Sequence, residues 1–149
     1  LFADAEPKTL EKLAKICELA TYEAGQYIYR KNDPAITFFV VKSGRVMDEH
    51  ALSPSVTASI GSLVVADCFG LSSLLPNSSY RSTMVAREDS QILHFIATDL
   101  LALARENKAF GASFYRGMAT VFLERLASRT DKLLKLLAAH PELKAVMDA

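Results

Sequence analysis

Turn signals at short and regular intervals constrain the fold of this chain more than any other feature. Between residues 21 and 63, the segments Ala24-Gly25, Asn32-Asp33-Pro34, Ser43-Gly44 and Ser53-Pro54 separate short runs of β-branched and aromatic residues. Strands separated by turn signals every eight to twelve residues or so are typical of a sandwich, jelly roll or barrel. The predicted strands span residues 26–30, 37–42, 45–50, 56–60, 82–87 and 91–95.

Helical patterns flank this β-rich region on both sides. The first twenty residues carry an apolar stripe at helical spacing, comprising Leu10, Leu13, Ala14, Ile16 and Cys17. After Ala97, either Thr98 or Asp99 is expected to cap a short helix, and a long helix is predicted over residues 110–139. The sequence therefore predicts a mainly β fold with flanking helices, a double-stranded β-helix (jelly roll) with an N-terminal helix and C-terminal helices. We expect a β-roll with its helices over residues 1–109, and a coupling or dimerisation helix with a tail over 110–149.

The long predicted helix has two apolar faces. One face combines two heptad series at the three- and four-residue spacing of a two-stranded seam: Ala112, Ala119, Leu126, Leu133 and His140 with Tyr115, Phe122, Arg129, Leu136 and Leu143. A neighbouring stripe holds Phe110, Phe114, Met118 and Val121. This pattern favours a homodimer formed through residues 110–139. The alternative is an amphipathic helix that lies only on its own domain.

Composition excludes several classes of protein. Half of the residues are hydrophobic, and 17 basic residues balance 17 acidic ones, so nucleic-acid binding by this segment alone is not expected. The chain lacks an apolar run of the roughly 18 residues that a membrane span requires. Cys17 and Cys68 show no pairing signature, which indicates reduced thiols and a cytoplasmic protein. The chain begins with Leu1 rather than Met, as a fragment of a longer protein would.

Residues 68–83 form a segment rich in hydroxyl groups, with Arg81 as its single charged residue. A glycine followed by a short helical turn presents unpaired backbone N–H groups that bind an anion. Gly70 stands in that position, and a nearby arginine with serine hydroxyls would complete a phosphate pocket. The alternative is a plain turn.

The opening Leu1-Phe2 and four later segments, taken in their order along the chain, resemble those of a known family. The later segments are residues 24–30 with 32–34, residues 41–46 (Val-Lys-Ser-Gly-Arg-Val) and residues 66–70 (Ala-Asp-Cys-Phe-Gly). Over about residues 1–137 the chain resembles the cyclic nucleotide-binding domain family, which includes the catabolite activator protein and protein kinase A regulatory subunits. The resemblance implies a small-molecule ligand bound at the turn after Phe69 and a ligand state passed to the C-terminal helix.

The departures from the family pattern fall on its ligand contacts. Leu71 occupies the position of the glutamate that binds the ribose hydroxyl in the family. Counted without a gap, Ser79 takes the proline position and Tyr80 that of the phosphate-binding arginine, while Arg81 follows one residue later. Strand alternation would point Arg81 away from the Tyr80 side, and a one-residue bulge would return it. Arg81 at the pocket favours ligand sensing, whereas a Tyr80 ring filling the pocket favours a degenerate module.

Several further residues complete the candidate site. Ser72 and Ser73 follow the glycine, Ser82 and Thr83 follow the arginine, and Arg129 and Thr130 lie where the family helix contacts the base. The alternative for Arg129 is a surface pair with Asp131 or Glu124. The full set of candidate ligand-binding residues is Phe69, Gly70, Leu71, Ser72, Ser73, Tyr80, Arg81, Ser82, Thr83, Arg129 and Thr130.

Catalysis is not expected, because no histidine and carboxylate can be placed beside Cys68 and His50, His94 and His140 are scattered. We expect no cofactor, apart from a possible cyclic nucleotide or other small anionic ligand. The predicted function is a regulatory ligand-sensing module with weak or altered nucleotide specificity. The alternative is a degenerate domain that binds no nucleotide and serves in dimerisation or protein interaction.

Overall fold

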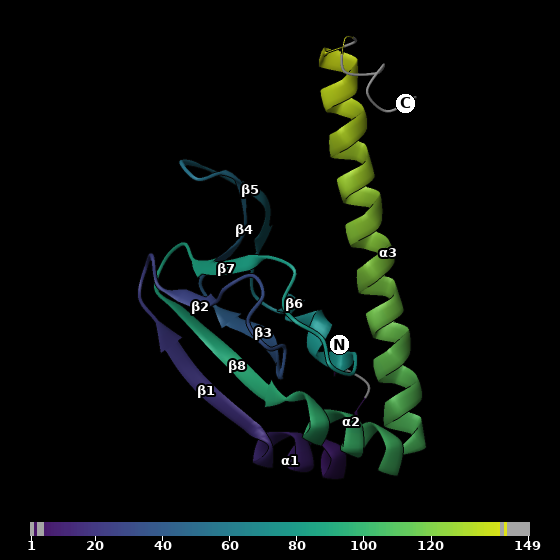
Figure 1. The fold of residues 1–149 in the computed structure, drawn as a ribbon. Helices are drawn as coiled ribbons and strands as arrows, with labels where there is room; N and C mark the ends of the chain where they lie inside the picture. Colours follow the sequence, from purple (N-terminus) through teal and green to yellow (C-terminus); the bar gives the residue numbers. More distant parts are fainter. Residues whose placement is uncertain (1, 3–4, 141, 143–149) are drawn as a thin grey trace.

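The computed structural model describes residues 2, 5–140 and 142, and it shows a β-roll flanked by helices (Figure 1). Helix α1 (Pro7–Lys15) precedes the strands, the 3-10 helix η1 (Leu71–Leu74) interrupts them, and α2 (Ala97–Glu106) and α3 (Lys108–Ala139) follow them. The described strands form two four-stranded antiparallel sheets. One sheet has the order β1 (Cys17–Tyr22), β8 (Ser90–Ile96), β3 (Thr37–Ser43), β6 (Cys68–Phe69), and the other β2 (Tyr27–Tyr29), β7 (Thr83–Ala86), β4 (Val46–Ser53), β5 (Val56–Leu63). This architecture confirms the predicted jelly roll with N-terminal and C-terminal helices.

All six predicted strands are present, with ends that differ by at most three residues. The helix predicted over the first twenty residues, however, is wrong in its second half. Helix α1 ends at Lys15, and Cys17 begins strand β1. This strand pairs with β8 over its whole length, from Cys17 opposite Phe95 to Tyr22 opposite Ser90. Pairing with a strand that lies about 75 residues later outweighs the local helical spacing, because strand formation depends on packing more than on intrinsic preference.

The β-roll has two hydrophobic clusters, and strand β3 contributes to both. Phe38 and Val40 face the cluster shared with the helices, whereas Phe39 and Val41 face the interior of the roll. This division follows from the alternation of side chains along a strand. The helix-side cluster also includes Phe95, Leu100, Phe110, Phe114 and Met118, and the interior cluster includes Tyr29, Phe69, Tyr80 and Ile92.

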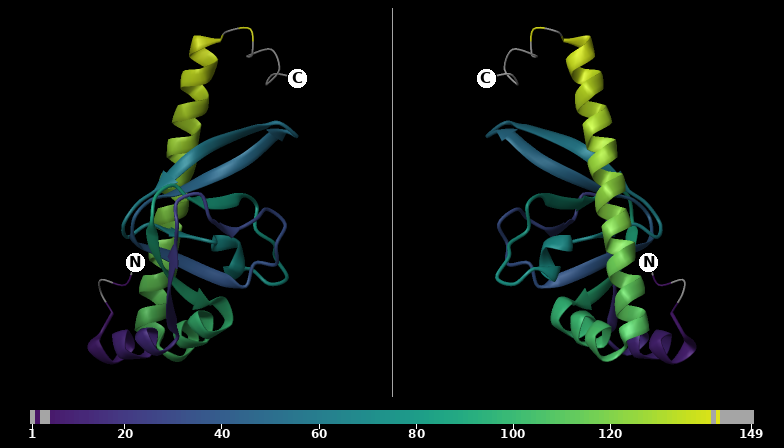
Figure 2. Two further views of the ribbon diagram at one scale, coloured as in Figure 1. Left: turned by 90° about the vertical axis from the view of Figure 1, so that its left-hand side faces the viewer. Right: turned by 90° about the vertical axis from the view of Figure 1, so that its right-hand side faces the viewer.

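Helix α3 packs on the roll through the buried residues of its first half, and its last turns extend beyond the strands (Figure 2). The stripe of Phe110, Phe114 and Met118 is buried, as the helix's own apolar pattern predicts. The helix begins at Lys108, two residues before the predicted boundary, because the Asn107 side chain caps it by accepting a hydrogen bond from the Phe110 N–H at 3.0 Å. The division of the chain at 109/110 stays a prediction.

Asp48 and Ile60 of the β4–β5 hairpin contact the outer half of α3, whereas the tip of the hairpin lies away from the helix (Figure 1). Contacts between the hairpin and the helix are made by polar side chains, among them Lys132, whose ammonium group donates to the Ile60 carbonyl at 2.9 Å. The last residues of the predicted seam include Leu143, which lies outside the described residues, as does Leu1 at the other end. None of the described helices has the length and apolar character needed to cross a membrane.

Candidate ligand-binding site

A cavity of about 430 Å³ lies between η1, the second sheet and α3. This volume falls within the range of about 300–1,000 Å³ that is usual for small-molecule sites. The cavity is bordered by residues from the β-roll and from one face of α3: Tyr29, Asp48, Phe69, Gly70, Leu71, Ser72, Arg81, Ser82, Met84, Phe122, Arg125, Leu126 and Arg129.

The structure brings most of the predicted ligand-binding residues to this one cavity. Those that border it are Phe69, Gly70, Leu71, Ser72, Arg81, Ser82 and Arg129. Ser73 is buried beside it in η1, Thr130 is exposed on α3, and the Thr83 hydroxyl accepts a hydrogen bond from the Lys31 N–H at 3.0 Å. Tyr80 lies in the interior cluster. The ligand-binding role of each of these residues stays a prediction.

Gly70 forms the turn that precedes η1 and borders the cavity. Its φ of 70° lies in the left-handed region, and η1 begins at the next residue. A Cβ atom built at this position would lie 2.7 Å from a ring carbon of Phe39 and 2.8 Å from the Thr37 carbonyl oxygen. Only glycine fits here without strain, because the conformation and the close approach both exclude a side chain.

Tyr80 and Arg81 face different environments, which resolves the question that the sequence left open. The Tyr80 ring is 5% exposed and stacks on Tyr29 with ring centroids 3.6 Å apart. Its hydroxyl donates to the Thr37 carbonyl at 2.9 Å and accepts from the Thr37 N–H at 3.2 Å. Tyr80 therefore belongs to the core behind Tyr29, and burial raises the pKa of its phenol.

Arg81, in contrast, is exposed and borders the cavity. The expectation that strand alternation would turn it away from the pocket is wrong, because residues 81 and 82 form a bend and β7 begins only at Thr83. A bend breaks the two-residue alternation of side chains that a continuous strand imposes. Arg81 thus stands where the pocket interpretation required it, and the Tyr80 ring does not fill the cavity.

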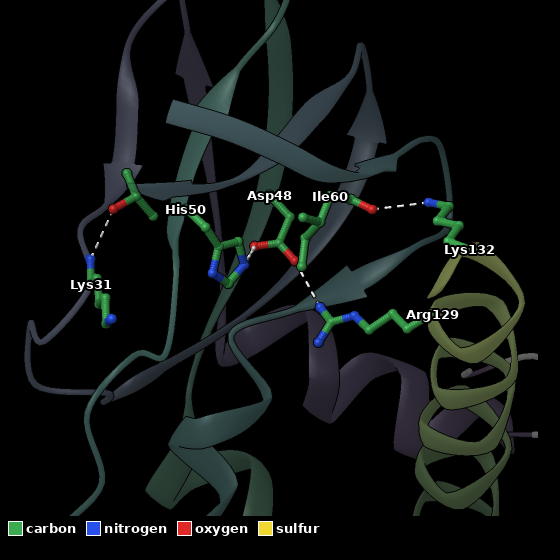
Figure 3. Close-up of polar contacts among 7 residues, drawn as sticks. Lys31, Asp48, His50, Ile60, Arg129 and Lys132 are labelled. Atoms are coloured by element: carbon green, nitrogen blue, oxygen red, sulfur yellow. Dashed lines mark hydrogen bonds and ion pairs between the residues drawn. The ribbon is translucent and has the colours of Figure 1, made fainter. Parts of the chain in front are cut away.

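Helix α3 supplies the opposite wall and two more guanidinium groups. Arg125 donates a hydrogen bond to the carbonyl oxygen of Cys68, the residue just before Phe69. Arg129 donates from Nη2 to Oδ2 of Asp48 at 2.8 Å, and Nε2 of His50 lies 3.1 Å from Oδ1 of the same carboxylate (Figure 3). The surface pair of Arg129 with Asp131 or Glu124, considered from the sequence, is not the arrangement found.

Sequence reasoning missed several residues that border this cavity. Arg125 lies four residues before Arg129, so both face the same side of the helix. That spacing was visible in the sequence, but the sequence did not show that this face of α3 contacts the β-roll. Asp48 was also missed, although alternation along the predicted strand places it on the same side as Val46 and His50. The other bordering residues missed from the sequence are Tyr29, Met84, Phe122 and Leu126.

The charges at the cavity suit an anion. Three arginines face one acid, and burial raises the pKa of the Tyr29 phenol, with Tyr80 and Asp48 adding to the effect, so Tyr29 stays neutral. A second cavity of about 430 Å³, beside Gly117 and Thr120 of α3, holds two acids, Asp67 and Glu124, with the single arginine Arg125. The cavity at Gly70 and Arg81 is therefore the better anion site of the two.

Comparison with known proteins identifies the family. The model of the cyclic nucleotide-binding domain matches residues 19–107, which is more than half of the chain. The chain belongs to the cyclic nucleotide-binding domain family. The Gly70 turn and Arg81 thus lie within the matched residues of a cyclic nucleotide-binding domain.

One curated relative contains the matching segment within a longer protein. Acetyltransferase Pat of Mycolicibacterium smegmatis is 34% identical over 89 residues, which cover 58% of this chain and 26% of that protein. The match thus spans about a quarter of the curated relative.

Solved structures share the fold. The catabolite activator protein of Thermus thermophilus aligns with a TM-score of 0.73 and 24% identity, over 92% of this chain and 62% of that one. A putative cyclic nucleotide-binding protein from Geobacter metallireducens aligns with a TM-score of 0.70 and 25% identity, over 84% of this chain and 90% of that one. A cyclic nucleotide-binding domain from Methylobacillus flagellatus aligns with a TM-score of 0.80 and 14% identity, over 91% and 76% of the two chains.

Proposed function

We propose that this chain is a ligand-sensing regulatory module rather than an enzyme, and that its ligand is a cyclic mononucleotide or a similar small anion. The observation that carries the proposal is the position of Arg81, whose side chain borders the cavity beside the Gly70 turn. A guanidinium group at the edge of a pocket binds a phosphate through charge-assisted and often bidentate hydrogen bonds. Ser72 and Ser82 border the same space and supply hydroxyl groups.

The same cavity provides a route from ligand to helix. Arg125, Phe122 and Leu126 of α3 form one wall, and the β-roll forms the other. A ligand that contacts both walls binds better to one position of α3 than to another, and such differential affinity is what shifts a conformational equilibrium. We propose that occupancy changes how firmly the outer half of α3 is held on the roll.

An exposed apolar face along α3, within residues 110–139, is also the proposed dimer interface. Phe122, Leu126 and Leu136 are 52%, 64% and 51% exposed, and Tyr115 and Leu133 belong to the same seam. Apolar side chains at three- and four-residue spacing along an exposed face favour pairing with a second copy of the helix. A module that only dimerises or binds a protein through this face remains the second candidate function.

We further propose that the module regulates an output region of a longer protein. The match to acetyltransferase Pat covers 26% of that protein, and the match to the Thermus catabolite activator protein covers 62% of that chain. The two unpaired cysteines, one half-buried and one buried, fit a cytoplasmic setting, which stays a prediction.

Thermal unfolding with a panel of ligands tests the proposed function. The panel comprises cyclic AMP, cyclic GMP, a cyclic dinucleotide, ATP and inorganic phosphate. A ligand present at a hundred times its dissociation constant adds about 2.7 kcal/mol to the free energy of unfolding, enough to raise the midpoint by several degrees. We expect a cyclic mononucleotide to raise it. Unchanged midpoints across the whole panel would support the interaction module instead.

A further inference from the structure

Asp48 is an acid in the wall of a cavity that suits anions, and both of its carboxylate oxygens are already engaged. Its side chain is 7% exposed, Oδ2 accepts from Arg129 at 2.8 Å, and Oδ1 lies 3.1 Å from Nε2 of His50 (Figure 3). The acid comes from β4 and the arginine from α3, so the pair also joins the helix to the second sheet.

This pairing removes Arg129 from the groups that can hold a ligand. Release of Arg129 would leave a buried carboxylate without its strongest partner, which is strongly unfavourable. Arg125 is also engaged, through its hydrogen bond to the Cys68 carbonyl. Among the residues that the structure describes, the guanidinium of Arg81 makes no hydrogen bond or ion pair. Of the three arginines at the cavity, Arg81 is therefore the one with a guanidinium group free to bind an anionic group of a ligand.

We propose that Asp48 restricts this cavity to ligands with a single anionic group, by withholding Arg129 from a second one. The inference rests on the proposed function, because it takes the cavity as the ligand site and names the class of ligand. A phosphodiester with one negative charge places that charge at Arg81. A ligand with two separate phosphate groups has no second free guanidinium to receive its other group, because Asp48 holds Arg129 and the Cys68 carbonyl holds Arg125.

Calorimetric titration of two ligands into the wild type and Asp48→Asn tests this assignment. The ligands are cyclic AMP, with one charged phosphodiester, and adenosine 3′,5′-bisphosphate, with two separate phosphate groups. The wild type is expected to prefer cyclic AMP. Asp48→Asn keeps the shape of the side chain, removes its charge and frees Arg129. It is expected to strengthen bisphosphate binding at least about tenfold more than cyclic AMP binding, since one charge-assisted hydrogen bond is worth a factor of this order.

Glu49→Gln is the matched control, because Glu49 is the next acid on β4 and does not border the cavity. This variant is expected to leave the ratio of the two affinities unchanged. If Asp48→Asn does not fold, Asp48→Ser removes the same charge with a smaller side chain.

Three results would overturn the inference while the proposed function stands. They are a wild type that binds the bisphosphate as tightly as cyclic AMP, an equal gain for both ligands in Asp48→Asn, and a change of the ratio in Glu49→Gln. If neither ligand binds to the wild type or the variants, and no ligand of the thermal-unfolding panel raises the midpoint, the proposed function is overturned and this inference with it.

Discussion

At the residue scale, two neighbours with different surroundings decide how the site is read. Tyr80 packs in the core on Tyr29, and Arg81 borders the cavity. The sequence predicted that these two positions would discriminate between a working and a filled pocket. Their arrangement could not be predicted from alternation, because the chain bends at residues 81 and 82 before β7 begins.

Gly70 is expected to be required for the local fold. Gly70→Ala places a Cβ atom in contact with Phe39 and the Thr37 carbonyl and forces a left-handed conformation on alanine. We expect a loss of about 2 kcal/mol or more in the free energy of unfolding, measured by urea denaturation.

Gly25→Ala is the control for Gly70→Ala, because Gly25 has a φ of 86° with nothing within 4 Å of a built Cβ. It is expected to lose only about 1 kcal/mol, the cost of the conformation alone. Equal losses in the two variants would show that the close approach at Gly70 does not matter.

His94 is expected to make the stability depend on pH. Burial lowers its pKa in the folded state, and the charge of Glu18 opposes this effect in part. The unfolded state, in which the pKa of histidine is about 6.5, then binds a proton more readily than the folded state. The contribution to stability is therefore present above about pH 6.5 and is lost as the pH falls from there toward the folded-state pKa.

Urea denaturation of the wild type and His94→Gln checks this dependence between about pH 7.5 and about pH 5.5. The wild type is expected to lose more stability over this interval than the variant, which lacks the titrating ring. An identical pH dependence in both proteins would contradict the assignment. Glutamine also retains a partner for the Tyr22 hydroxyl, which lies 3.2 Å from Nε2 of His94.

At the element scale, the outer half of α3 is held by polar contacts and the inner half by burial. Arg129 and Lys132 contact Asp48 and Ile60, whereas Phe110 and Phe114 lie in the core. The apolar stripe of the inner half was predictable from helical spacing. The outer contacts were not, because they depend on where the β4–β5 hairpin lies in space.

Arg129→Gln is expected to loosen the outer half of α3 selectively. Loss of the pair with buried Asp48 should speed hydrogen exchange of the amides in residues 125–137 on the order of tenfold, since local opening free energies set these rates. Amides of residues 110–118 should keep their protection. Lys135→Gln, an exposed lysine on the same helix, is the control, and equal effects of the two variants would argue against the Asp48 contact as the anchor.

Two strands, β1 and β6, were not predicted from the sequence, for different reasons. Strand β6 has only Cys68 and Phe69, which is too short for any alternation to show. Strand β1 follows α1 directly, and its partner β8 comes at the end of the roll. The other six strands were predictable because turn residues bound them.

At the scale of the whole molecule, the order of motifs was sufficient to predict the fold and the family. Part of the β-roll side of the cavity was also predicted from sequence, because Phe69, Gly70 and Arg81 lie within one short segment. Tyr29, Asp48 and Met84 on the same side were missed, because they come from three separate strands. The α3 wall was found only in part, since a heptad pattern shows which residues share a face and not what that face contacts.

Self-association through α3 is a property of the whole molecule and gives a further prediction. Leu126→Glu places a charge in the middle of the exposed seam and is expected to convert dimers to monomers in sedimentation. Leu19→Glu is the control, because Leu19 is 46% exposed on β1, away from α3. A wild type that sediments as a monomer at high concentration would contradict the dimer.

The proposed function depends on the cavity at Arg81 as the ligand site, and calorimetric titration of cyclic AMP tests this most directly. Arg81→Gln is compared with the wild type and with Arg87→Gln, which changes another exposed arginine outside the cavity. We expect binding to the wild type and Arg87→Gln, and a loss of at least about tenfold in affinity in Arg81→Gln, as the removal of a charge-assisted phosphate contact implies. Cyclic AMP binding of equal strength to all three proteins would contradict the account.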